Sequence, residues 1–400
     1  MDGPLKNLLV VDLTRVLVGP YCTMILSDLG ARVIKIEAPE IGDDSRKFGP
    51  FIEEYSAYFM SLNRGKESIA LNLKKEEDKK IFDKILSKAD ILVENFKPGT
   101  LERWGYGWGD VSKKYPKLIY ASASGFGQTG PLKELPAYDM VVQGMGGLMS
   151  VTGQPNSEPT GVGTSIGDIT AGLFTTIGIN AALYDREKTG KGGEVSTSLM
   201  ANGAWANGVF IQAALMDIEF PERTEPLPRH PFYDFYQTKD NREFALGMIN
   251  SRIEWPKLTE VLDRADWLQR ELFDFDDAFQ NADILRSELS DEFMKRSLDE
   301  INELLRNSGV TYGVLGKTTD HRDDKQFLET KTLVPLSHES FENLLTINSP
   351  FTIQDENKID FSRAPNVGEH TKEVLENMGY SDAELEDLKD GSAIYWPNKL

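Results

Sequence analysis

The sequence is poor in the features that mark several classes of protein. It holds a single cysteine, Cys22, which excludes an intramolecular disulfide framework and favours a reducing compartment, the cytoplasm. No Gly-x-Gly-x-x-Gly follows the first predicted strand, so nicotinamide-dependent chemistry has little support. The four histidines are scattered without the spacing of paired metal ligands: His230, His321, His338 and His370.

The balance of charge argues against two kinds of partner. Acidic residues outnumber basic ones by 64 to 44, and the formal net charge is −20. Binding to nucleic acid or to an anionic membrane needs an excess of Lys and Arg, so we expect neither as a partner. The opening residues MDGPLKNLLVVDLT reach only a strand-length apolar run. We therefore expect neither a signal peptide nor a transmembrane helix there.

Basic residues nevertheless gather in the first quarter of this acidic chain. Several follow predicted strands, which is where open α/β sheets bind ligands. Each one alone is explained as a solvated surface charge, whereas together they would form an electropositive groove for a phosphate-bearing ligand. The set consists of Arg15, Lys35, Arg46, Lys47, Arg64, Lys66, Lys74, Lys97 and Arg103.

The first 200 residues alternate short β-branched runs with amphipathic helical stretches. This alternation is typical of a parallel sheet with crossover helices, so we predict a doubly wound α/β domain. Helices are predicted at Gly19–Leu29 and Lys74–Ala89. The predicted strands are Leu8–Leu13, Arg32–Glu37, Ser68–Leu73, Asp90–Phe96, Lys117–Ala121 and Glu194–Leu199.

Composition divides the chain into four parts. Residues 1–215 carry the α/β pattern, and residues 216–235 form a proline-bearing linker that favours extended backbone. A hairpin turning at Asp240-Asn241 opens a charged, helix-rich region, which predicts a smaller domain at 236–315. Residues 316–400 return with short β-like runs and a terminal helical piece.

Two segments could carry chemistry. Asp168 stands between a glycine and a long apolar helix, where backbone N–H groups gather and favour anions. It is therefore a candidate nucleophilic carboxylate, although plain helix capping explains the position equally simply. In the loop ENFKPGTLERWG, Asn95 could pair with a planar polar group and Phe96 could stack on one.

Seven ordered blocks resemble the class III CoA-transferases. They are DLTRVLVGPYCTMILSDLGARVIKIE, LNRGKESIALNLK, ADILVENFKPGTLERWGYG, SASGFGQTGP, YDMVVQGMGGLMSVTG, IGDITAG and APNVGEHTKEVLENMGYS. The resemblance implies a large Rossmann-like domain built from both chain ends, a small middle domain and an interlocked homodimer. It implies acyl-CoA and a small carboxylic acid as substrates, with no tightly bound cofactor and no metal.

The resemblance also implies roles for individual residues. The family's nucleophile falls on Asp168, and Leu17, Tyr58, Tyr138 and Asp139 fall in the substrate pocket. Formyl-CoA transferase has a glutamine at the position of Leu17 and a run of glycines over its active site that is absent here, which argues against formate and oxalate as the natural pair. Residues of the CoA site would be Val16, Val18, Leu71, Lys74, Asn95, Phe96 and Arg103.

Transfer through a protein carboxylate divides one difficult exchange into easier steps, by way of a mixed anhydride and an aspartyl-CoA thioester. Succinyl-CoA is our leading donor.

Two alternative functions stay open, a 2-methylacyl-CoA racemase and a non-catalytic CoA-binding protein. The racemases use a histidine where this chain has Tyr138, and a phenol, with a usual pKa of about 10, is a poor proton carrier at neutral pH.

Overall fold

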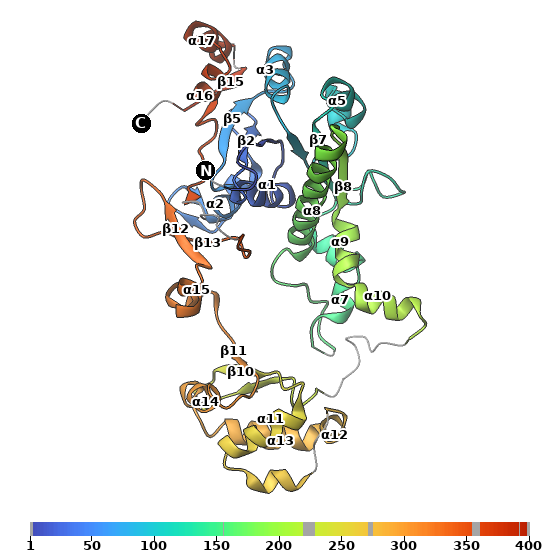
Figure 1. The fold of residues 1–400 in the computed structure, drawn as a ribbon, viewed down its shortest axis with the longest axis vertical. Coiled ribbons are helices and arrows are strands. Elements are labelled where there is room, and N and C mark those ends of the chain that lie inside the picture. Colours follow the sequence, from blue (N-terminus) through green and yellow to red (C-terminus); the bar gives the residue numbers. More distant parts are fainter. Residues whose placement is uncertain are drawn as a thin grey trace. The chain divides into compact units, whose positions relative to one another are not determined.

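The computed structural model describes residues 3–154, 156–218, 229–270, 275–353, 361–391 and 393–397. Contacts divide the chain into two compact units, Met1–Arg223 with Leu328–Leu400, and Thr224–Phe327 (Figure 1). Of the linker predicted at 216–235, residues 219–228 lie outside the described residues.

The first unit is built on a sheet of seven strands in the order β15-β5-β2-β1-β6-β7-β8. Six strands are parallel, and β15 pairs antiparallel with β5. The predicted α/β class is confirmed, and each of the six predicted strands is present to within three residues at either end. The strands are β1 (Leu9–Asp12), β2 (Arg32–Glu37), β5 (Glu67–Leu71), β6 (Ile91–Glu94), β7 (Ile119–Ser124), β8 (Glu194–Ser198) and β15 (Ile394–Tyr395).

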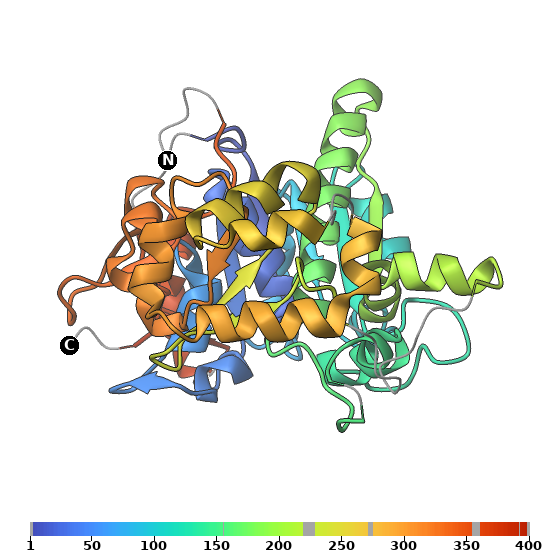
Figure 2. The same ribbon diagram turned by 90° about the horizontal axis from the view of Figure 1, so that it is seen from below.

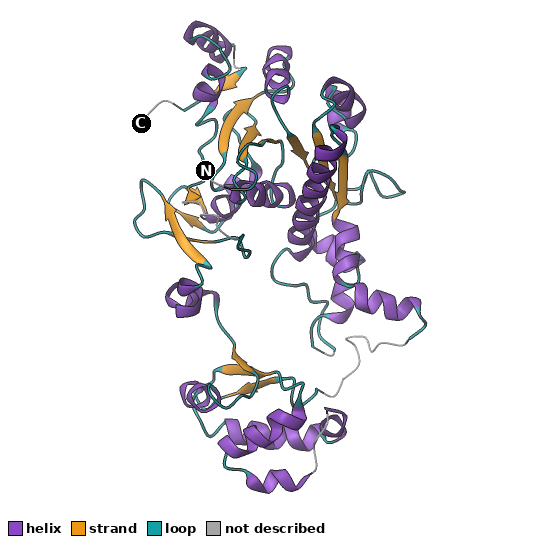
Figure 3. Cartoon of the chain, in the orientation of Figure 1, coloured by secondary structure: helices purple, strands orange, loops and turns teal. Residues whose placement is uncertain are grey.

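Helices cover both faces of this sheet because its strands are apolar on both sides (Figure 3). Val10 packs into a core with residues of α1 and α8, whereas its neighbour Val11 packs on the other face with α3, α16 and α17. The helices of this unit are α1 (Val18–Asp28), α2 (Ala57–Asn63), α3 (Glu76–Leu86), α4 (Thr100–Trp104), α5 (Trp108–Lys114), α6 (Asp139–Met145), α7 (Leu148–Val151), α8 (Ile166–Thr189), α9 (Leu199–Ala206), α10 (Gly208–Leu215), α16 (Thr371–Glu376) and α17 (Asp382–Asp390).

Both ends of the chain build the first unit. The amide N–H of Ser68 in β5 donates to His370 Nδ1 at 3.1 Å, and that of Ala70 donates to Thr371 Oγ1 at 3.0 Å. Short elements complete this unit: the 3₁₀ helix η1 (Asp44–Lys47), the hairpin β3 (Phe51–Ile52) and β4 (Tyr55–Ser56), and the sheet of β12 (Leu333–Ser337), β13 (Leu345–Ile347) and β14 (Phe361–Ser362).

Helix α8 is, by length and composition alone, apolar enough to cross a membrane. It packs against α1, α9 and β8, and a Cβ at Gly172 would lie 2.8 Å from the Val18 carbonyl oxygen. The side of α8 that carries Leu173 and Ile177 is exposed. Helix α10, which follows α9, extends away from the sheet in both ribbon views (Figures 1 and 2).

The second unit is a small body of helices and one antiparallel sheet with its own core. Its antiparallel sheet has the order β11-β10-β9, and the hairpin predicted at Asp240-Asn241 is confirmed, with Asn241 at a φ of 56°. The rings of Trp255 and Trp267 stack 5.6 Å apart in the core. Its elements are β9 (Phe235–Gln237), β10 (Glu243–Leu246), α11 (Ser251–Val261), η2 (Ala265–Arg270), α12 (Phe275–Gln280), α13 (Ala282–Phe293), α14 (Leu298–Leu305), β11 (Tyr312–Val314) and η3 (Thr318–Asp323); α15 (Lys325–Glu329) spans the boundary between the two units.

Candidate active site

A cleft of about 320 Å³ lies at the carboxyl ends of β1, β6 and β7. Strand order reverses between β1 and β6, because the chain builds outward on one side through β2 and β5 and on the other through β7 and β8. Open α/β sheets bind ligands at such a switch point. The lining residues are Arg15, Val16, Leu17, Val18, Asp44, Asn95, Phe96, Lys97, Pro98, Ala123, Ser124, Gly125, Lys133, Leu135, Pro136, Ala137, Tyr138, Asp168 and Leu199.

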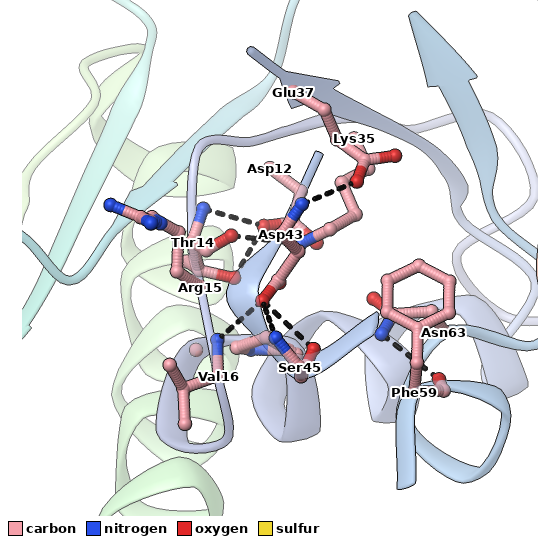
Figure 4. A network of polar contacts seen from close by, with 12 residues as sticks. Asp12, Thr14, Arg15, Val16, Lys35, Glu37, Asp43, Ser45, Phe59 and Asn63 are labelled. Carbon is pink, nitrogen blue, oxygen red and sulfur yellow. Dashed lines mark hydrogen bonds and ion pairs between the residues drawn. The ribbon is translucent and has the colours of Figure 1, made fainter. Parts of the chain in front are cut away.

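One wall of the cleft is the turn between β1 and α1. Val16 has a φ of 69°, a conformation that is strained for a β-branched residue by roughly 1–3 kcal/mol. The turn is held by its polar neighbours (Figure 4): the Val16 amide donates to Asp43 Oδ1 at 3.1 Å, and Lys35 Nζ donates to the Thr14 carbonyl at 2.8 Å. An ion pair of 2.9 Å joins Lys35 to Asp43 beneath the turn.

Buried charges stabilise one another below this turn. Lys66 Nζ lies 3.1 Å from Asp12 Oδ2, and both side chains are fully buried. Burial alone would raise the pKa of Asp12, but Lys35 and Lys66 hold it well below its usual range. Burial likewise opposes ionisation of Asp43, yet Lys35 and hydrogen bonds from Ser45 and Val16 lower its pKa to about 2. The network is therefore charged at neutral pH.

This network changes the interpretation of the basic residues in the first quarter. Lys35, Lys66, Arg46 and Arg64 are paired with carboxylates inside the fold. Of the nine basic residues, Arg15 and Lys97 line the cleft. Arg15 also forms an exposed ion pair with Asp44. The electropositive groove expected from the whole set is thus reduced to a few cations.

Asn95 ties two turns of the cleft together. Its Oδ1 accepts from the Arg15 amide at 2.8 Å, and its Nδ2 donates to the Arg15 carbonyl at 2.7 Å. The side-chain amide of Asn95 thus holds the backbone of the turn after β1. Phe96 beside it is half-buried, and its ring meets that of Trp104 edge-on at 5.5 Å.

Asp168 forms part of the opposite wall, in the first turn of α8. The residue at the N-cap position is Ser165, so Asp168 follows the cap. The carboxylate of Asp168 is half-buried and faces the cleft, and among the described residues no group donates a hydrogen bond to it. This arrangement leaves both oxygens available to a ligand.

A second carboxylate, that of Asp139, accepts hydrogen bonds from the backbone amides at this end of α8. Asp139 Oδ1 accepts from the Gly167 amide at 2.7 Å and from the Asp168 amide at 3.2 Å. A Cβ at Gly167 would lie 2.9 Å from that oxygen, so glycine permits the close approach. The anion-favouring helix end that the sequence suggested for Asp168 is therefore occupied by Asp139.

Burial and this neighbour both disfavour the ionised form of Asp168. Burial, and then the negative charge of Asp139, raise the pKa of Asp168 to about 7. Burial and the charge of Asp168 also raise the pKa of Tyr58 to about 12, so this phenol stays protonated at neutral pH. A carboxylate that titrates near neutral pH in a cleft is typical of a functional site.

The structure brings together most of the residues that the sequence assigned to the site. Lining the cleft are Val16, Leu17, Val18, Asn95, Phe96, Tyr138 and Asp168. Asp139 lies behind Asp168, and Tyr58 is close enough for electrostatic interaction with it. The other three lie outside the lining: Leu71 is buried in β5, while Lys74 and Arg103 are exposed.

Sequence reasoning missed Lys133 and Gln143. Lys133 lines the cleft, and its position just after the glycine cluster SASGFGQTGP is the signal that could have revealed it. Gln143 is buried and donates to Asp139 Oδ2 at 2.6 Å; the spacing of four residues on one helix is the signal that could have revealed this contact.

The segment Gly163–Gly167 reads Gly-Thr-Ser-Ile-Gly and so matches the spacing of a serine hydrolase elbow. That elbow requires a strand immediately before the serine. Residues 156–165 contain no strand, and Ser165 is the N-cap residue of α8. The match is therefore one of spacing alone.

Comparison with known proteins shows similarity over nearly the whole chain. Residues 5–371 match the model of CoA-transferase family III. An acetyl-CoA:oxalate CoA-transferase of Acetobacter aceti is 44% identical over 322 residues, which cover 78% of this chain and 81% of that protein. A succinyl-CoA:mesaconate CoA-transferase of Haloarcula marismortui is 34% identical over 390 residues, 94% and 97% of the two chains. The crystal structure of a CAIB/BAIF family protein from Brucella suis matches with a TM-score of 0.84 at 31% identity, covering 94% of this chain and 100% of that one.

The titration of Asp168 tests this geometry. We expect its carboxyl group to titrate near pH 7 in the unliganded protein, and Asp139→Asn to lower that pKa because a neighbouring negative charge is removed. Carbon NMR of protein labelled at the aspartate carboxyl groups, with Asp168→Asn to assign the resonance, measures both. Asp110→Asn, on the exposed surface of α5, is the control. An unchanged pKa in Asp139→Asn would contradict the interpretation.

Proposed function

This chain belongs to CoA-transferase family III, and from this membership we propose that it moves CoA from an acyl-CoA thioester to a small carboxylic acid through covalent intermediates on Asp168. The observation that carries the proposal is the position of Asp168, whose carboxylate faces the cleft while the adjacent amides donate to Asp139. A carboxylate whose negative charge is not stabilised by hydrogen bonds is a better nucleophile.

The reaction follows from the chemistry of two carboxylates and one thiolate. The Asp168 carboxylate attacks the thioester carbonyl, and CoA thiolate leaves, which gives a mixed anhydride. The thiolate then attacks the aspartyl carbonyl, so the first acid departs and an aspartyl-CoA thioester remains. The acceptor acid attacks that thioester and displaces CoA, and the thiolate finally attacks the acceptor's carbonyl. Asp168 is regenerated as a carboxylate.

Each addition creates an oxyanion that needs a hydrogen-bond donor. The first amides of α8 are already donating to Asp139, so they are poorly placed for this role. The phenol of Tyr58 stays protonated and lies near Asp168. We assign Tyr58 as a donor to the developing charge, in the substrate pocket with Leu17 and Tyr138.

The cleft indicates how the substrates bind. Arg15, Lys97 and Lys133 supply positive charge for the CoA phosphates in an otherwise acidic protein. The lining around the acyl group is partly apolar, from Leu17, Ala137 and Leu199. Acetyl-CoA and succinyl-CoA, the donors named for the two relatives, are the donors we propose, with a small dicarboxylic acid as the acceptor. Neither a metal nor a tightly bound cofactor takes part in these steps.

We also propose that the enzyme is an interlocked cytoplasmic homodimer, as the family resemblance implies. Helices α6, α8 and α10 all pack against α9, and together the four helices expose large apolar side chains. The largest exposures on these helices are those of Met140, Trp205, Val209 and Leu215, each above 70%. Large apolar side chains exposed on helices that pack together favour an interface with another chain.

Asp168→Asn tests the role of the nucleophile. We expect transfer to fall by about 10³-fold or more, since the amide cannot form the anhydride, while CoA binding changes little. Transfer from acetyl-CoA and succinyl-CoA to a panel of acids is followed by mass spectrometry, and hydroxylamine should trap a hydroxamate on Asp168 of the unsubstituted enzyme. Asp110→Asn is the matched control. Near-normal transfer by Asp168→Asn would refute the mechanism.

Lys97→Ala and Lys133→Ala test the binding of CoA. Each should raise the KM for acyl-CoA by about three- to tenfold with a smaller change in kcat, and added salt should reduce the difference. Lys113→Ala, an exposed lysine of α5, is the control. Arg103→Ala, measured in parallel, decides whether Arg103 contacts CoA from beyond the cleft. If both cleft variants keep the normal KM, the phosphates bind elsewhere.

Trp205→Glu tests the homodimer. A charge at the centre of the apolar helices should shift the protein from dimer to monomer in sedimentation velocity, because burying an unpaired carboxylate is costly. Ile347→Glu, at an exposed position of β13, should leave the dimer intact. A monomeric unsubstituted protein would refute the proposal.

A further inference from the structure

Gln143 connects the helix that carries Asp139 with the segment that leads into α8. The side chain is 3% exposed. Its Nε2 donates to Asp139 Oδ2 at 2.6 Å and to the Val162 carbonyl at 3.4 Å, and its Oε1 accepts from the Val162 amide at 2.8 Å. Both the donor and the acceptor of this buried amide are therefore used.

The Asp139 carboxylate is consequently held from two sides. Gln143 binds Oδ2, while the amides of Gly167 and Asp168 donate to Oδ1. A carboxylate on a two-bond stem rotates freely unless both oxygens are engaged. Gln143 thus fixes the rotation of this carboxylate about its stem, so that one oxygen stays at the amides of α8.

Gln143 also fixes the backbone on the other side. Residues 156–165 have neither helix nor strand, so this segment has few hydrogen bonds of its own to hold it. The pair of bonds between Gln143 and Val162 resembles the pairing of two backbone segments. It anchors this segment to α6 four residues before α8 begins.

We propose that Gln143 is a positioning residue that acts through Asp139: it holds that carboxylate across the first turn of α8 and thereby sets the orientation and charge environment of Asp168. The inference rests on the proposed function of Asp168. Its effect is specific, because Asp139 keeps the amides of α8 from solvating the nucleophile and places a like charge beside it. A nucleophile that is neither hydrogen-bonded nor paired with a cation is more reactive.

Gln143→Met tests the proposal, since methionine matches glutamine in length and lacks both polar groups. We expect kcat to fall about tenfold with a change of less than about twofold in the KM for acyl-CoA, as for loss of a charge-assisted hydrogen bond. The acid limb of kcat/KM should move to lower pH, because a loosened Asp139 repels the Asp168 carboxylate less. Gln280→Met, at an exposed position of α12, is the control.

A double-mutant cycle shows whether Gln143 acts through Asp139. In an Asp139→Asn background, Gln143→Met should lower kcat by less than about twofold, because the carboxylate that Gln143 positions is already altered. A full tenfold loss in that background, or a raised KM with normal kcat, would overturn the proposal. If Gln143→Met does not fold, Gln143→Glu replaces it: the neutral acid can still donate to Asp139, so its activity relative to the unsubstituted enzyme at the same pH should be near normal at low pH and fall as the glutamate ionises.

Carbon NMR separates failure of this proposal from failure of the proposed function. The resonance of Asp168 reports its titration with or without turnover. A lower titration midpoint in Gln143→Met supports the positioning role even if no acid accepts CoA, and an unchanged midpoint overturns it even if transfer is observed.

Discussion

The carboxylate of Asp139, lying across the amino end of α8, is the contact on which the chemistry of the site depends. A helix amino terminus stabilises anions through its free amides and its dipole. If those amides faced Asp168, they would stabilise its charge and weaken it as a nucleophile. Asp139 takes the amides of Gly167 and Asp168 instead, and its charge opposes ionisation of Asp168. The helix thus fixes the position of Asp168. Asp139 prevents the amides at the end of that helix from stabilising the negative charge of the Asp168 carboxylate.

The facing wall has a different physical origin. The turn of Thr14–Val18 is strained at Val16, and the buried charges of Asp12, Lys35 and Asp43 hold it. Such groups are costly to bury, but removing one member of a buried pair costs about 3–5 kcal/mol because the other is left uncompensated. The conformation of the turn is therefore coupled to the stability of the whole sheet. Asn95, which follows β6, also holds this turn by hydrogen bonds to the backbone of Arg15.

Sequence patterns predicted the parts of this architecture that depend on local order. The segment Arg32–Glu37, which holds three β-branched residues, is a strand with the bounds that the sequence predicts. Strand β15 could not be predicted from the sequence, because two residues near the far end of the chain carry no periodic signal. For Lys35 and Lys66 the sequence leaves two explanations open, solvated surface charge and a phosphate-binding groove, because their burial against Asp43 and Asp12 appears only in the fold. Asp168 was identified from its segment, whereas the contact with Asp139, 29 residues away, was not.

The central claim is that a covalent aspartyl intermediate carries CoA, and the fate of oxygen atoms tests it most directly. In the proposed cycle the bridging oxygen of the second anhydride comes from the acceptor acid and stays on Asp168 when CoA departs with the acceptor's acyl group. With acceptor acid labelled with oxygen-18 in its carboxylate, turnover should therefore place the label in the peptide that contains Asp168, and in the donor acid released in later cycles. Direct attack of one acid on the other's thioester would also label the released donor acid. Label in that acid without label in Asp168 would contradict the account.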